Sequence, residues 1–174
     1  MDATVTPVSS SFLQRTCERL AGWTIATAAF ALLVLVLVQG WQVIARYVLN
    51  DSPSWTEPVT LLMLSTAMSM GAAAGVHTRR HFAFSLLAEA LGARAKHAVH
   101  LLQSVVVVII GLMLAYWGGV LFIDGVHIPT AGAPLPESID YLPLAIGGAL
   151  MALFAVSQMI HDIGAADGKP AEAH

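Results

Sequence analysis

Seven histidines are the side chains in this sequence best suited to chemistry, and two pairs of them have helical spacing. His77 and His81 are four residues apart and His97 and His100 are three apart, so either pair could share a helix face and bind a metal or a haem. Both pairs fall among cationic side chains, which disfavour a cationic metal. These cations are Arg79, Arg80, Arg94 and Lys96. We therefore expect no metal site and no cofactor.

The long apolar stretches of the chain contain no Asp, Glu, Lys or Arg. A transporter that acts alone normally needs polar or ionisable groups inside the membrane to bind its ion or substrate. Only hydroxyl and amide side chains are available there: Gln39, Gln42, Ser65, Thr66, Ser69, Gln103 and Gln158. The sequence also has no phosphate-binding glycine loop, nucleophile elbow or paired carboxylates. We predict that the protein is not an enzyme and that it works as a subunit.

Composition places these residues in a membrane protein. The chain is 57% hydrophobic and 11% charged, with a mean hydropathy of +0.74, whereas a soluble domain carries about 25% charged residues. Four stretches approach the roughly 20 apolar residues that cross a bilayer: 21–45, 58–76, 98–123 and 141–160. We predict an all-α integral membrane protein with a lead at 1–20, one four-helix membrane domain at 21–161 and a tail at 162–174. The first apolar run is too long for a signal peptide, so we expect it to remain as a span.

Orientation follows from the lysines and arginines, because cytoplasmic loops carry the excess of them. With four spans, the N-terminus, the loop between spans two and three and the C-terminus share one side. That side holds seven cations: Arg15, Arg19, Arg79, Arg80, Arg94, Lys96 and Lys169. The other side holds Arg46 alone. Both termini are predicted to be cytoplasmic.

Two further patterns concern surfaces that could contact a partner. Ala67, Gly71 and Gly75 recur every four residues, and the third and fourth spans carry similar small-residue faces at 111–119 and 148–155. Such faces allow helices to approach closely in lipid, either within this chain or against a second membrane protein. Between spans two and three, apolar residues at helical spacing in 82–91 indicate either a short amphipathic helix in the inner interface or an extension of the neighbouring spans.

The sequence of the turn between the first two spans does not decide which residue caps the start of the second helix. Ser54 and Glu57 have the spacing of a capping box, in which both side chains bond to free N–H groups. Pro58 complicates that assignment, because proline is favoured at the first helical position and not later.

Several stretches taken together resemble the small membrane subunit of tripartite ATP-independent periplasmic (TRAP) transporters. They are Ile44-Ala45-Arg46-Tyr47-Val48-Leu49-Asn50, then Trp55-Thr56-Glu57, then Met70-Gly71-Ala72-Ala73-Ala74-Gly75-Val76, then Arg79-Arg80-His81-Phe82, and finally the run from Pro136 to Gly147. The resemblance extends from about Gly40 to the tail. Two positions depart from the family pattern, because Pro58 and Ser85 stand where acidic residues are common.

The resemblance implies a bacterial inner-membrane complex that imports organic acids by using an ion gradient. In such a complex a periplasmic protein delivers the solute, and a large many-span subunit binds and moves it. The small subunit is expected to serve as a fixed scaffold for the moving part. The partners implied are therefore the large subunit, the periplasmic solute-binding protein and the lipid bilayer, with no nucleic acid.

The family pattern also suggests which residues matter. We hypothesise that Arg46, Trp55 and Glu57 organise the outer ends of the first two spans, and that Gly71 and Gly75 form a packing face. Arg79, Arg80 and His81 are expected to anchor the inner end. For the tryptophan and the charged residues the simpler role is membrane anchoring, since interfacial tryptophans and loop arginines are common in membrane proteins. For the two glycines it is packing among the chain's own helices.

Two other classes remain as alternatives. The first is a haem- or quinone-binding membrane anchor of a redox enzyme, which depends on the histidines. The second is a small self-contained exporter, which would require polar groups near the membrane midplane.

Overall fold

The computed structural model describes residues 8–51, 53–78 and 93–167. Its elements are α1 (Val8–Tyr47), α2 (Thr56–His77), α4 (Ala93–Asp124), the 3-10 helix η1 (Gly125–His127) and α5 (Ser138–Asp167). Four of these helices are long and apolar enough to cross a membrane. The prediction of an all-α chain with four helices long and apolar enough to cross a membrane is therefore confirmed for the described residues. The amphipathic helix expected within 82–91 lies outside them, as do Arg79, Arg80 and His81.

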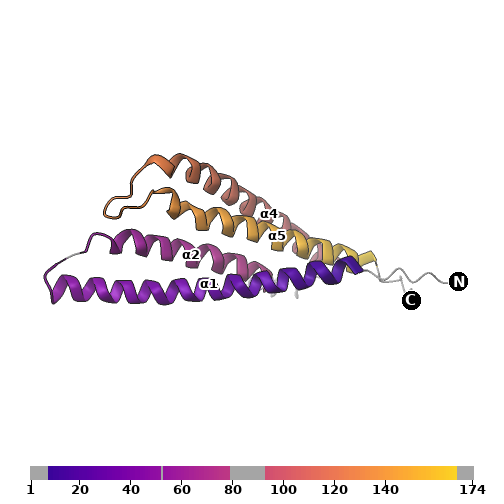
Figure 1. Ribbon diagram of the computed structural model, residues 1–174. Coiled ribbons are helices and arrows are strands. Elements are labelled where there is room, and N and C mark those ends of the chain that lie inside the picture. The colour runs from indigo at the N-terminus through magenta and orange to yellow at the C-terminus, as the bar shows by residue number, and fades with distance from the viewer. Residues whose placement is uncertain (1–7, 52, 79–92, 168–174) are drawn as a thin grey trace.

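The four long helices form two hairpins placed side by side. α1 packs against α2, α2 against α5 and α5 against α4, so the order across the molecule is α1–α2–α5–α4 (Figure 1). α1 also touches α5, although much less extensively. We call the end at which α1 leads into α2 and α4 into α5 the loop end, and the opposite end, near both chain termini, the terminal end. The arrangement is an open row, in which α1 and α4 each have one main neighbour.

The α1 seam follows a regular spacing of four and three residues. The seam consists of Cys17, Ala21, Thr24, Ala28, Ala31, Leu35, Val38, Gln42 and Ala45, and the neighbouring Leu20 and Val34 are also half-buried. A repeat of 3.5 residues keeps one side of a helix against its neighbour in a left-handed pair. Most of these side chains are small, so the helices can lie close together in the absence of a hydrophobic drive between them.

The α4–α5 hairpin is held by close contact between small residues. A Cβ atom added at Gly111 would lie 2.7 Å from the backbone nitrogen of Ala152, and one added at Gly148 would lie 2.6 Å from that of Ala115. Gly118 approaches Ala145 in the same way, also at 2.7 Å. The small-residue faces predicted in the third and fourth spans therefore pack against each other, apart from Gly119, whose Cβ would meet nothing within 4 Å.

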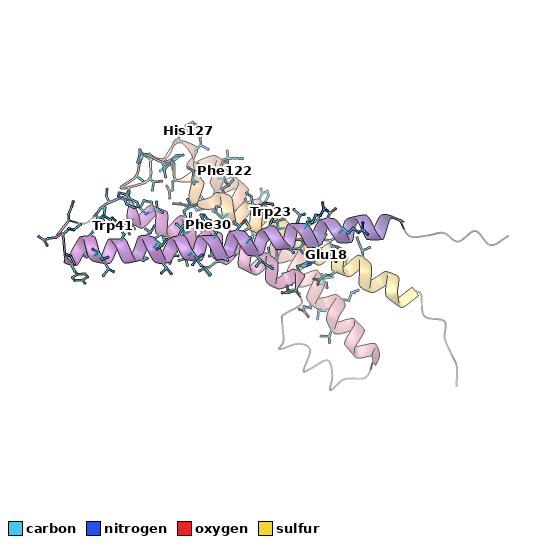
Figure 2. The ribbon with its side chains drawn as sticks, turned by 60° about the horizontal axis from the view of Figure 1, so that its bottom comes forward. Glu18, Trp23, Phe30, Trp41, Phe122 and His127 are labelled. Carbon is cyan, nitrogen blue, oxygen red and sulfur yellow. The ribbon has the colours of Figure 1, made fainter. Side chains whose placement is uncertain are left out.

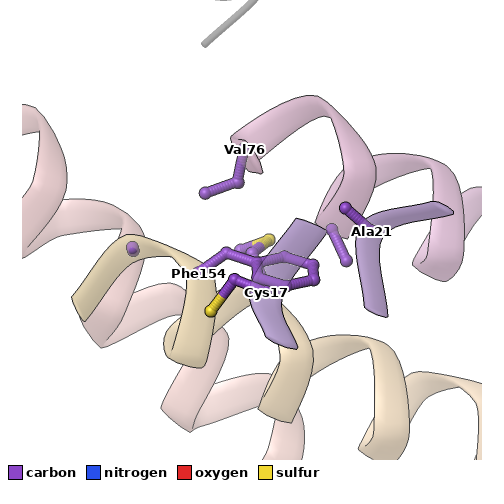
Figure 3. Close-up of a cluster of buried hydrophobic side chains, with 7 residues drawn as sticks. Cys17, Ala21, Val76 and Phe154 are labelled. Carbon is purple, nitrogen blue, oxygen red and sulfur yellow. The ribbon is translucent and has the colours of Figure 1, made fainter. Parts of the chain in front are cut away.

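A buried cluster joins α1, α2 and α5 toward the terminal end (Figure 3). It consists of Cys17, Ala21, Ala73, Val76, Met151, Phe154 and Ala155. Phe154 is 1% exposed and is the largest side chain in it. This cluster is where the two hairpins are joined.

Candidate functional site

One side of α2 is covered by neither α1 nor α5. The exposed residues of this helix recur at spacings of three and four and so lie on one stripe. The stripe consists of Glu57, Leu61, Leu64, Met68, Gly71, Ala72, Gly75 and Thr78, of which Gly75 is half-buried and the others exposed. The structure thus brings Glu57, Gly71 and Gly75 together on one surface, which we call the α2 stripe. Arg46 and Trp55 lie beyond it, at the loop end.

The small residues of the α2 stripe have no neighbour. A Cβ atom added at Gly71 or at Gly75 would meet nothing within 4 Å in the described part of the chain. Gly147 of α5 differs, because a Cβ there would lie 2.6 Å from the Cβ of Ser69 on α2. The side of α2 that faces α5 is therefore closely packed, whereas the glycine side is open. Of the two uses considered for small-residue faces, packing within the chain applies to α4 and α5 but not to Gly71 and Gly75.

Arg46 and Trp55 occupy the two sides of the turn that links α1 to α2. Both side chains are exposed, Trp55 by 44%. The structure shows no ion pair between Arg46 and Glu57, although both are exposed at the same end of the molecule. The capping box predicted for Ser54 and Glu57 is not formed. The N-cap of α2 is Trp55 and not Ser54, and it makes no side-chain hydrogen bond to the helix. Thr56, which is fully buried, instead donates its hydroxyl to the backbone oxygen of Pro53 at 2.8 Å.

Ser54 has a different role from the predicted cap. Its hydroxyl donates to the backbone oxygen of Gly132, at 3.1 Å, and so joins the turn between α1 and α2 to the loop between α4 and α5. Gly132 has φ +89, and a Cβ there would lie 2.5 Å from the backbone oxygen of Ser54. Only glycine fits this close approach without strain. A second link lies deeper, where Ser65 donates to the backbone oxygen of Asp140 at 3.3 Å.

Three side-chain contacts fix the hairpins to each other at the terminal end. The Gln158 amide donates to the backbone oxygens of Val76 and His77, at 2.7 and 3.1 Å. The rings of His77 and Phe154 lie 5.1 Å apart. Cys17 Sγ lies 3.6 Å from Ser157 Oγ and donates to it. From the sequence, Gln158 was identified only as a polar residue within a span. Its position near the end of the last span was the one sign that it could bond to the end of another helix.

The histidines do not form a site in the described part of the chain. No group of three or more His, Cys, Asp or Glu side chains there could hold a metal ion. His77 packs on Phe154, while His127 lies at the loop end of the other hairpin, far along the molecule (Figure 2). His81 is not among the described residues. The haem- or quinone-anchor alternative therefore gains no support from the described residues.

Several polar groups within the helices form hydrogen bonds inside the chain. Thr24, Thr60 and Thr66 each donate to the backbone oxygen four residues earlier in the same helix. No buried side-chain nitrogen or oxygen in the described residues lacks a hydrogen-bond partner. The outer surfaces are apolar instead, and Phe30 and Trp23 on α1 are 65% and 75% exposed (Figure 2). These surfaces suit lipid or another membrane protein.

Comparison with known proteins identifies a matching family. Residues 35–165 match the family model described as Tripartite ATP-independent periplasmic transporters, DctQ component. The match covers all of α2 and α4, nearly all of α5 and the loop-end part of α1. No curated protein matches the chain.

Proposed function

This chain belongs to the family of DctQ components of tripartite ATP-independent periplasmic transporters, and we propose that it is the fixed scaffold of the membrane part. It is a small permease subunit, with four helices suited to crossing the membrane. As a scaffold it would hold a large many-span subunit in place while that subunit moves the solute. The complex would import an organic acid delivered by a periplasmic solute-binding protein.

The observation that supports a scaffold is the closeness of the helix contacts. Gly111, Gly118 and Gly148 bring the backbones of α4 and α5 into contact, and Gly147 does the same for α5 and α2. Closely packed interfaces resist deformation, so the row is expected to behave as one unit. No charged side chain lies in the middle of any helix pair, which agrees with solute binding elsewhere in the complex.

We propose the α2 stripe as the docking face for the large subunit. Open glycines allow a partner helix to approach closely, and dispersion contacts made by such an approach stabilise helix association in lipid. Met68, 67% exposed, and Leu61, 53% exposed, would fill space on the same face. Glu57 at the loop end would set the partner's register by an ion pair or a hydrogen bond.

The proposed orientation puts the loop end in the periplasm and both termini in the cytoplasm. It is supported by the distribution of lysine and arginine, since the loop end carries Arg46 alone. In that orientation Arg79, Arg80 and His81 would lie on the cytoplasmic side, where we propose that they anchor the chain to lipid or to the large subunit. The membrane would be the bacterial inner membrane.

The experiment that tests this function is affinity purification of the tagged chain from native membranes in mild detergent, followed by mass spectrometry. We expect stoichiometric recovery of one much larger, many-span membrane protein. Uptake of organic acids by vesicles should then require both chains and an ion gradient. Recovery of the chain alone, or together with a soluble redox enzyme, would contradict the proposal.

A further inference from the structure

A groove of about 400 Å³ opens at the loop end, between the last turns of α1 and the first turn of α2. Six residues line it: Trp41, Ala45, Leu49, Asp51, Pro53 and Trp55. Small-molecule sites in proteins have volumes of about 300–1,000 Å³. Trp41 is 47% exposed and Trp55 44% exposed, so both indole rings are accessible. The groove lies apart from the α2 stripe, with which it shares no residue.

The backbone around this groove is held by several hydrogen bonds. Beyond the end of α1 at Tyr47, Asn50 has a left-handed backbone with φ 53, and the Asp51 N–H donates to the backbone oxygen of Ala45 at 3.0 Å. This bond brings Asp51 back toward the last turn of α1. On the other side, the bonds from Thr56 to Pro53 and from Ser54 to Gly132 fix the turn that leads to Trp55. The groove is thus part of an ordered turn.

The chemistry of the lining favours a cationic ligand group. Trp41 and Trp55 offer indole faces, to which ammonium groups are attracted most strongly among the aromatic side chains. Asp51 adds a carboxylate, which is exposed and forms no ion pair with any described residue. A carboxylate and two indoles around one space would bind an ammonium group by charge and by cation–π attraction. An anionic ligand would be repelled by Asp51.

Arg46 adds a second charge at the loop end, although it is not one of the residues that line the groove. It follows Ala45, which lines the groove, and its exposed guanidinium also forms no ion pair with a described residue. Guanidinium groups suit phosphate because their N–H donors match its oxygens in pairs. One negative and one positive side chain therefore lie within six residues of each other, at a level of the helices where Trp and Tyr are concentrated. Such a pair complements a zwitterion with a phosphate next to an ammonium.

We propose that this groove binds the headgroup of phosphatidylethanolamine. The ammonium would lie between Trp41, Trp55 and the Asp51 carboxylate, and the phosphate would face Arg46. The acyl chains would lie along the apolar surface of α1, where Val43 is 56% exposed. Aromatic side chains at this level are typical of the membrane interface, which is where lipid headgroups lie. The proposal requires that the helices cross a bilayer and does not depend on the scaffold role.

The test is lipid retention measured by native mass spectrometry. The full-length chain, with any membrane subunit that co-purifies, is equilibrated with mixed micelles containing equal amounts of phosphatidylethanolamine, phosphatidylcholine and phosphatidylglycerol, and in a separate sample with free phosphoethanolamine. Asp51→Asn is compared with Asp124→Asn, which removes another exposed carboxylate near the loop end. Trp41→Leu is compared with Trp117→Leu, since Trp117 is 53% exposed but does not line the groove. Helix content measured by circular dichroism checks that each variant is folded.

We expect the wild-type chain to retain one molecule of phosphatidylethanolamine in preference to phosphatidylglycerol. Asp51→Asn should weaken this binding about tenfold, as expected for the loss of a charge-assisted hydrogen bond, and Trp41→Leu about threefold. Phosphatidylcholine should bind with intermediate affinity, because its quaternary ammonium retains the cation–π attraction but cannot donate to Asp51.

Three outcomes would overturn the proposal. The first is equal retention of phosphatidylglycerol, which would mean that the ammonium is not recognised. The second is an equal loss in the Asp124 or Trp117 control variant, which would indicate a general effect of surface charge or aromaticity. The third is retention of free phosphoethanolamine but not of the lipid, which would make the groove a site for a soluble zwitterion.

Discussion

Gln158 on α5 donates its side-chain amide to the backbone oxygen of Val76, at 2.7 Å, in the last turn of α2. The carbonyl groups of a final helical turn have no partner within their own helix. The same nitrogen also donates to the backbone oxygen of His77, at 3.1 Å. One side-chain amide of α5 therefore provides hydrogen bonds for carbonyl groups at the end of α2. At the terminal end the two hairpins are thus joined by a bond from a side chain to backbone, in addition to the contacts between side chains there.

Replacing Gln158 by leucine should therefore destabilise the contact between α2 and α5. We expect the free energy of unfolding in mild detergent, measured by titration with a denaturing detergent, to fall by about 1 kcal/mol. Gln103→Leu is the matched control, because Gln103 is a half-buried glutamine of α4 that makes no hydrogen bond with a described residue. Equal effects of the two substitutions would mean that the bond to Val76 contributes little.

Ser157→Cys offers a test of whether the row moves as one unit. Because Cys17 Sγ lies 3.6 Å from Ser157 Oγ, a cysteine at 157 should form a disulfide with Cys17 under mild oxidation after small adjustments. If the chain is a fixed scaffold, the oxidised complex should retain solute uptake in proteoliposomes. The double variant Cys17→Ser with Ser157→Cys controls for the oxidant. A loss of uptake that is reversed by a thiol reductant would show that α1 and α5 move relative to each other during transport.

Two glycines of α4 should respond to alanine in opposite directions. Gly111→Ala places a methyl group 2.7 Å from the Ala152 backbone, so overpacking of about 1–3 kcal/mol should exceed the roughly 1 kcal/mol gained in helix propensity. Gly119→Ala meets nothing within 4 Å and should be neutral or slightly stabilising. Thermal unfolding of the two variants in detergent measures the difference. A stability loss at Gly119 as large as that at Gly111 would contradict the described packing of α4.

Adding bulk to the α2 stripe should reduce assembly without unfolding the chain. Gly71→Leu fills open space on this stripe, so the isolated chain should remain folded while recovery of the large subunit in affinity purification falls about tenfold. The matched control is Ala149→Leu, which adds bulk at an exposed small residue of α5. Glu57→Gln tests the polar end of the same stripe. Normal assembly and uptake in both α2 variants would exclude this stripe as the docking face.

The four helices could be predicted from sequence because each is a long apolar run, and the structure places every predicted span within one helix. The order of the helices in the row could not be predicted from sequence. A helix that is apolar on all sides gives no amphipathic signal to show which side meets a neighbour. Gly111 and Gly71 look alike in sequence, each within a four-residue repeat of small residues, yet one is packed against backbone and the other is open.

The polar contacts were also beyond prediction, for a different reason. Ser54 has the local spacing of a helix cap, but its hydroxyl bonds to Gly132, which is 78 residues away. In the sequence, Asp51 is one of several turn residues. In the structure, it lines the same groove as Trp41 and Trp55. Local rules identify residues that can form a bond, whereas the choice of partner depends on how the hairpins meet.

The order α1–α2–α5–α4 also has a consequence for biogenesis. Each outer pair consists of helices that are consecutive spans in the chain, so its contacts become available as soon as its second helix has entered the bilayer. The contact between α2 and α5 instead must wait for the last helix to be synthesised. A ribosome-bound chain that ends near residue 137 would thus contain a complete first hairpin, together with an α4 that has not yet acquired its main neighbour. Until α5 is inserted, the α5-facing sides of α2 and α4 are free to be recognised by a membrane insertase or to be degraded by a quality-control protease.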